Sequence, residues 1–122
     1  MGGKMSRDKG ARGERELAGI LRGYGYDKSR RAQQYCGSET SADVLGLPGI
    51  HIEVKRTEAL SLYPAVAQAK RDTGNSGDYP VVFHRRSDYK WLVIMELDDW
   101  IEIYRKWEAG QVNDNIKIGG TD

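Results

Sequence analysis

The stretch from Asp43 to Lys55 constrains the fold of this chain more than any other. It reads Asp-Val-Leu-Gly-Leu-Pro-Gly-Ile-His-Ile-Glu-Val-Lys, two short apolar runs around a Leu-Pro-Gly turn, which predicts a β-hairpin. In the second run, apolar residues alternate with His51, Glu53 and Lys55, so Glu53 and Lys55 share one face, about 7 Å apart. The antiparallel partner strand brings Asp43 close to Glu53. Two carboxylates and an ammonium group on one patch indicate a site for a metal ion and a phosphate.

Composition sets the class of protein in which this hairpin must lie. The chain has 122 residues, 39% of them hydrophobic and 30% charged, which fits one globular domain. No run approaches the roughly 18 apolar residues of a membrane span, and no signal peptide is recognisable, so we expect a cytoplasmic protein without a membrane partner. The single cysteine, Cys36, excludes an intramolecular disulfide. One cysteine and two histidines also argue against a structural zinc site.

Charge is distributed unevenly along the chain. Residues 1–35 carry nine Lys or Arg against four Asp or Glu, a balance of +5, whereas residues 91–122 carry three against seven, a balance of −4. A basic first half is compatible with a phosphate-binding face, because neutralising phosphates dominates affinity for nucleic acids. A solvated helix face is the alternative, and charge alone favours it slightly.

Residues 8–22 are expected to form a helix. Glu14, Leu17 and Leu21 fall on one stripe of it, with Ala18 beside them. A carboxylate on a stripe that faces the core is costly unless it has a partner. Glu14 therefore requires an arginine, a metal ion or a hydrogen-bond donor nearby, and the helix pattern leaves these alternatives open.

The remaining periodicities complete an α/β domain with a central mixed β-sheet flanked by helices. They predict a strand or edge within 24–35, a loop at 36–41, a helix over 60–73, strands at 80–84 and 91–95, and a helix from about Leu97 with an apolar stripe through Tyr104. We expect a single domain over 1–122 with flexible ends at 1–7 and 110–122, and Trp100 and Trp107 as helix-packing residues. The expected core is Leu17, Ile20, Leu21, Val44, Ile52, Val54, Val66, Val82, Phe83, Leu92 and Ile94.

Together these motifs resemble the PD-(D/E)XK nuclease superfamily. Asp43, a spacer of nine residues and Glu53-Val54-Lys55 are similar to its signature, with Ala42 in place of the usual proline. The helix over 9–17 resembles the N-terminal helix of archaeal-type Holliday junction resolvases and related phage nucleases. Two shorter matches support it: Gly37-Ser38 before the aspartate and Gln68-Ala69 on the following helix.

The resemblance implies a restriction-endonuclease-like core and an activity. The expected activity is that of a Mg²⁺-dependent endodeoxyribonuclease, with Mn²⁺ as the other candidate ion, which hydrolyses phosphodiester bonds in branched DNA as Holliday junction resolvases do. A homodimer is expected, since paired nicks across a branch need two sites. So compact a nuclease would suit a phage or prophage. Two alternatives stay open: a nuclease of the same superfamily that acts on flaps, forks or other DNA, and a non-catalytic DNA-binding module on the same scaffold.

The resemblance also assigns roles to individual residues. The catalytic set is Glu14, Asp43, Glu53, Lys55 and Gln68. The metal ligands are Asp43, Glu53, the main-chain carbonyl of Val54 and, directly or through water, Glu14. The candidate DNA contacts are Arg12, Arg15, Arg30, Arg31, Ser38 and Arg56. The alternatives without a catalytic role are a surface ion-pair ladder for the hairpin residues, a helix-surface amide for Gln68 and an incidental strand histidine for His51.

Overall fold

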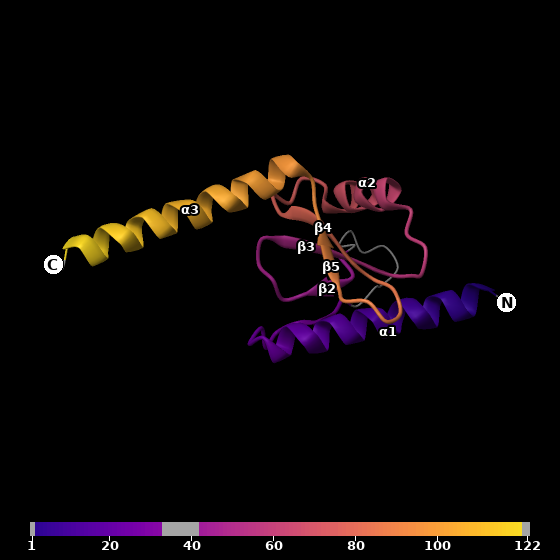
Figure 1. Cartoon of the computed structure of the whole chain (residues 1–122). Coiled ribbons are helices and arrows are strands. Elements are labelled where there is room, and N and C mark those ends of the chain that lie inside the picture. Colours follow the sequence, from indigo (N-terminus) through magenta and orange to yellow (C-terminus); the bar gives the residue numbers. More distant parts are fainter. Residues whose placement is uncertain (1, 33–41, 121–122) are drawn as a thin grey trace.

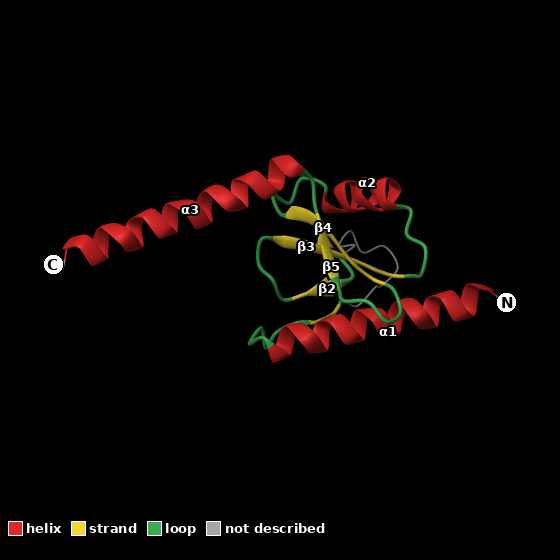
Figure 2. Cartoon of the chain, in the orientation of Figure 1, coloured by secondary structure: helices red, strands yellow, loops and turns green. Residues whose placement is uncertain are grey.

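The structure of the chain, a computed structural model, describes residues 2–32 and 42–120, with side chains described for 10–32 and 42–111. Within these residues it shows a five-stranded sheet and three helices (Figures 1 and 2). In chain order the elements are α1 (Gly2–Gly23), β1 (Arg30–Arg31), β2 (Val44–Leu45), β3 (Ile50–Arg56), α2 (Leu62–Thr73), β4 (Tyr79–Arg85), β5 (Leu92–Ile94) and α3 (Leu97–Gly120). None of the described helices is long and apolar enough to cross a bilayer.

The strands lie side by side in the order in which they occur in the chain. The predicted hairpin is confirmed: β2 and β3 are antiparallel, with Val44 opposite Ile52. β3 and β4 are parallel, with Glu53 beside Val82, and the remaining neighbours are antiparallel. Parallel strands need a crossover connection, which α2 provides between β3 and β4. The sheet is therefore mixed, and the predicted α/β class is confirmed.

Helix α1 covers one face of the sheet (Figure 2). Its predicted apolar stripe is correct, since Leu17 and Leu21 are buried in one core cluster with Ile52 of β3. The helix lies very close to the strand at Gly13. A Cβ atom there would lie 2.5 Å from Cβ of Arg56, so only glycine permits this approach.

Helix α2 covers the opposite face, where Ala65 and Ala69 form a second cluster with Val82 of β4. Most of the predicted core is buried: Leu17, Leu21, Val44, Ile52, Val54, Val82 and Phe83. Val66 and Ile94 pack against the second cluster as partly buried residues. The prediction was wrong for Ile20 and Leu92, which are exposed. Ile20 lies at the border of the α1 stripe, and Leu92 lies on the edge strand β5.

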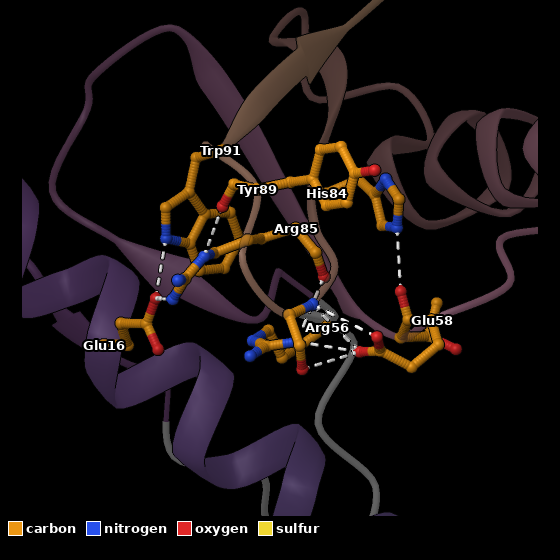
Figure 3. A network of polar contacts seen from close by, with 9 residues as sticks. Glu16, Arg56, Glu58, His84, Arg85, Tyr89 and Trp91 are labelled. Carbon is orange, nitrogen blue, oxygen red and sulfur yellow. Dashed lines mark hydrogen bonds and ion pairs between the residues drawn. The ribbon is translucent and has the colours of Figure 1, made fainter.

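A charged network ties the turn between β4 and β5 to the rest of the domain (Figure 3). Glu16 of α1 accepts hydrogen bonds from Arg85 and from the indole nitrogen of Trp91, the latter at 2.9 Å. Glu58, which follows β3, accepts from the main-chain N–H of Ser87 at 3.0 Å. The β4–β5 hairpin is thereby fixed to both α1 and the end of β3.

Both terminal helices are longer than the sequence pattern predicted. α1 begins at Gly2 and α3 continues to Gly120. The flexibility expected for 1–7 and 110–122 stays a prediction. The interpretation of Trp100 and Trp107 as residues that pack α3 onto the domain was wrong, because both side chains are exposed on a helix that projects away from the sheet (Figure 1).

Candidate active site

The β2–β3 hairpin places two carboxylates at the centre of the sheet. Asp43 directly precedes β2 and Glu53 lies in the middle of β3, and their side chains are only 9% and 3% exposed. The turn depends on Gly46, whose φ of +116° favours glycine. A Cβ at this position would also lie 2.4 Å from Oγ of Ser29. Backbone geometry therefore fixes the position of the acidic pair.

Asp43 is held by the neighbouring strand and is electrostatically strained. Its Oδ2 accepts a 2.7 Å hydrogen bond from the main-chain N–H of Val54. Burial, and after it the negative charge of Glu53, raise the pKa of Asp43 to about 7 against an ordinary value of 3.8. The hydrogen bond from Val54 opposes this rise, and the charge of Glu14 adds to it. The neutral form of Asp43 is therefore favoured beside the Glu53 carboxyl group.

Glu53 has an unexpected neighbour in His51. The Nε2 atom of His51 lies 3.5 Å from Oε1 of Glu53, and both side chains are buried. Within the described part of the chain, neither of these two atoms has a hydrogen-bond partner. Sequence reasoning set His51 aside, although its position on the same strand face as Glu53 was the signal that could have found it.

Lys55 and Gln68 meet as expected from the sequence. The Nζ atom of Lys55 donates a 2.8 Å hydrogen bond to Oε1 of Gln68, which reaches down from α2. Gln68 is therefore not a free amide on the helix surface. It fixes the ammonium group of Lys55 on the face of β3 that also carries Glu53.

Glu14 is partnered by an arginine, one of the alternatives that its position on the α1 stripe left open. Its Oε1 accepts a 2.8 Å hydrogen bond from Nε of Arg31. Arg31 lies on β1 opposite Val44, the residue after Asp43. The pair thus lies beside the acidic site, and the effect of Glu14 on the pKa of Asp43 reflects this proximity. A contact between Glu14 and a metal ion stays a prediction.

The predicted DNA contacts differ in their accessibility. Three of them are exposed arginines: Arg12, Arg15 and Arg30. Arg31 is occupied by Glu14, and the half-buried Arg56 bonds to Glu58 at 3.3 Å and to the main-chain oxygen of Arg85 at 3.4 Å. Ser38, together with Gly37 and Cys36, lies outside the described residues.

The chemistry of this site fits a hard divalent cation. Asp43 and Glu53 offer oxygen ligands, and among the described residues Oε1 of Glu53 has no hydrogen-bond partner, while burial and the nearby Glu53 raise the pKa of Asp43. Among the described residues, no three His, Cys, Asp or Glu side chains form a ready-made metal centre. Mg²⁺ fits such an incomplete set, because it is commonly held by one or two carboxylates together with waters and substrate phosphates. At Val54 the structure shows the N–H group in use, and the role of its carbonyl stays a prediction.

Comparisons of this chain with protein-family models, with curated proteins and with solved structures give no match. The site must therefore be interpreted from its own geometry.

Proposed function

We propose that this protein is a metal-dependent DNA endonuclease that hydrolyses phosphodiester bonds in branched DNA, in the manner of Holliday junction resolvases. The observation that supports the proposal is the buried pair Asp43 and Glu53, with Lys55 on the same strand as Glu53. A buried like-charge pair is costly and persists where function requires it. The arrangement of these three residues is also the one that the resemblance to PD-(D/E)XK nucleases calls for.

Each residue has a defined part in the proposed reaction. Asp43 and Glu53 hold a divalent ion, Mg²⁺ or Mn²⁺, and the N–H of Val54 keeps the Asp43 carboxylate in place. When bound, the ion offsets charge on the phosphate and lowers the pKa of a bound water. Lys55, held by Gln68, orients the attacking water or offsets the negative charge that develops on the scissile phosphate.

The surroundings of the site also support a DNA substrate. Arg12, Arg15 and Arg30 are exposed and give the first third of the chain its basic character. Arginine contacts to phosphates position a nuclease on its substrate without reading sequence. Helices on both faces of a mixed sheet, with a parallel β3–β4 pair, are compatible with a restriction-endonuclease-like core, which forms part of this proposal.

Cleavage of defined DNA structures tests the proposal. An immobile four-way junction, a flap and a linear duplex are incubated with the protein in Mg²⁺ or Mn²⁺. We expect symmetric nicks in the junction, a loss of at least about 100-fold in rate for Glu53→Gln, and a similar loss for Lys55→Ala. Glu102→Gln, an exposed glutamate on α3, serves as the matched control and should cleave normally.

The outcomes separate the alternatives. Preferential cleavage of the flap would identify a nuclease of the replication-repair type. Binding of the junction without cleavage would identify a DNA-binding module. Cleavage by Lys55→Ala at the rate of the unmodified protein would remove Lys55 from the mechanism. Since symmetric nicks require two active sites, the proposal includes a homodimer.

A further inference from the structure

Helix α3 is amphipathic, and its apolar side faces away from its own domain. Leu97, Trp100, Tyr104 and Trp107 recur at helical spacing and form one stripe, which we call the α3 ridge. Leu97 is 70% exposed and Trp107 is 57% exposed. The rings of Trp100 and Tyr104 stack at 5.2 Å, and those of Tyr104 and Trp107 lie 5.5 Å apart.

Asp99, Ile103 and Lys106 mark the side of α3 that faces the domain. Lys106 donates a 3.4 Å hydrogen bond to the hydroxyl group of Tyr79 at the start of β4. Asp99 is half-buried on the same side, and Glu96, directly before the helix, forms an ion pair with Lys70 of α2 with 3.2 Å between Nζ and Oε1. Lys106 lies two positions after Tyr104, and Asp99 lies two positions after Leu97. Two positions correspond to about 200° around a helix, so both residues lie on the side opposite the ridge. The ridge consequently points outward and is not covered by the sheet.

A groove lies directly beyond the start of the ridge. It has a volume of about 690 Å³ and is lined largely by apolar side chains, among them Leu60, Leu62, Leu92 and Ile94; we call it the β5 groove. A second hollow of about 410 Å³ shares Leu62 and Ile94 with this groove and includes Leu97 of the ridge. Groove, hollow and ridge therefore form one continuous surface, which is apolar in the groove and along the ridge.

We propose that this surface binds a second copy of the chain, with the α3 ridge of each copy seated in the β5 groove of the other. A ridge that continues directly into a groove is complementary to itself under a two-fold axis through their junction, as a symmetric dimer requires. This inference deepens the homodimer included in the proposed function. Its test measures molecular mass and not DNA cleavage. Failure of the proposed interface can therefore be distinguished from failure of the proposed nuclease function.

Charge is complementary in the same arrangement. Asp98 is exposed next to Leu97 and lines the same hollow as that ridge residue. The exposed cations Arg86 and Lys90 lie at the rim of the β5 groove. A two-fold axis at Leu97 brings Asp98 of one α3 toward the basic rim of the other copy. Attraction of this kind fixes the register of an interface.

The exposed area is appropriate for part of a dimer interface. Aromatic side chains bury roughly 150–250 Å² each when fully covered, so the three half-exposed rings of the ridge leave about 300 Å² open. A stable interface buries about 800 Å² on each partner. These three rings supply less than half of that area, so the groove must be part of the contact.

The test measures the mass of the full chain by sedimentation equilibrium over a concentration series. We expect a dimer for the unmodified protein. Trp107→Glu in the ridge and Leu92→Glu in the groove should each weaken dimerisation at least about tenfold. Tyr24→Glu is the control, because Tyr24 is an exposed aromatic residue directly after α1, far from ridge and groove in the sequence. Circular dichroism confirms that each variant is folded.

A mixing experiment distinguishes ridge-in-groove packing from contact between two ridges. An equimolar mixture of the Trp107→Glu and Leu92→Glu proteins retains one intact ridge and one intact groove on different chains. We expect this mixture to form heterodimers more tightly than either variant forms homodimers. A monomeric unmodified protein, dimers that survive both substitutions, or a mixture that stays as weak as its components would each overturn the proposal.

Discussion

Replacing Asp43 by asparagine is expected to stabilise the protein in the absence of divalent ions above pH 7. Burial and the charge of Glu53 raise the pKa of Asp43 from 3.8 to about 7, so the folded state binds this proton more tightly than the unfolded state. The free energy of unfolding therefore falls as the pH rises from about 4 to about 7, and the full penalty is present above pH 7. Asparagine carries no charge and avoids this penalty.

The magnitude follows from the same values. Each pH unit between the two pKa values corresponds to about 1.36 kcal/mol, which gives an upper limit of about 4 kcal/mol. The oxygen of an asparagine at 43 can still accept the hydrogen bond from the N–H of Val54. Relaxation of the site reduces the penalty for a charged Asp43 in the unmodified protein. We therefore expect the free energy of unfolding of Asp43→Asn to exceed that of the unmodified protein by about 2 to 4 kcal/mol at pH 8.

Urea denaturation in EDTA at pH 5 and pH 8 measures this effect. Asp43→Asn should gain more stability at pH 8 than at pH 5, whereas Asp27→Asn, at an exposed aspartate, should change stability by less than about 0.5 kcal/mol. Saturating Mn²⁺ should then stabilise the unmodified protein and have little effect on Asp43→Asn. If Asp43→Asn were less stable than the unmodified protein at pH 8 in EDTA, the charge of Asp43 would not be destabilising the fold.

Three further substitutions test the packing and the site. Gly13→Ala should lower the free energy of unfolding by about 1–3 kcal/mol, because the new methyl group meets Arg56, whereas Gly10→Ala, in open space on the same helix, should raise it by up to about 1 kcal/mol in the same denaturation assay. Gln68→Ala should lower the junction cleavage rate about tenfold with the fold unchanged, and a normal rate would show that Lys55 needs no partner. Glu16→Ala should speed amide hydrogen exchange in the β4–β5 turn, and unchanged exchange would assign that order to other contacts.

Most of the fold is predictable because local patterns determine it. Period-2 alternation around the Leu-Pro-Gly turn specified the β2–β3 hairpin, and the stripe of Leu17 and Leu21 specified the buried face of α1. The ridge of α3 was recognised as an apolar stripe as well. A stripe shows that a helix has an apolar side but not which surface covers that side, and this is why Trp100 and Trp107 were assigned to the wrong contact.

The candidate site was predictable only in part, because its remaining contacts join distant segments. Asp43 and Glu53 come together through one hairpin, and Gln68 lies one crossover away from Lys55. The partner of Glu14 depends on the register of β1 against β2, which two short strands do not reveal in the sequence. The same holds for the raised pKa of Asp43, since it requires knowledge of burial on both faces of the sheet.

The geometry also argues against a simple surface ion-pair ladder. In a ladder, Asp43, Glu53 and Lys55 would be exposed and the ammonium group would contact the carboxylates. Instead both acids are buried, and Lys55 donates its described hydrogen bond to the uncharged Gln68. Lys55 is thus directed to an amide and not to the carboxylates. If the site holds a cation as proposed, ion binding should stabilise the fold as well as enable the proposed reaction.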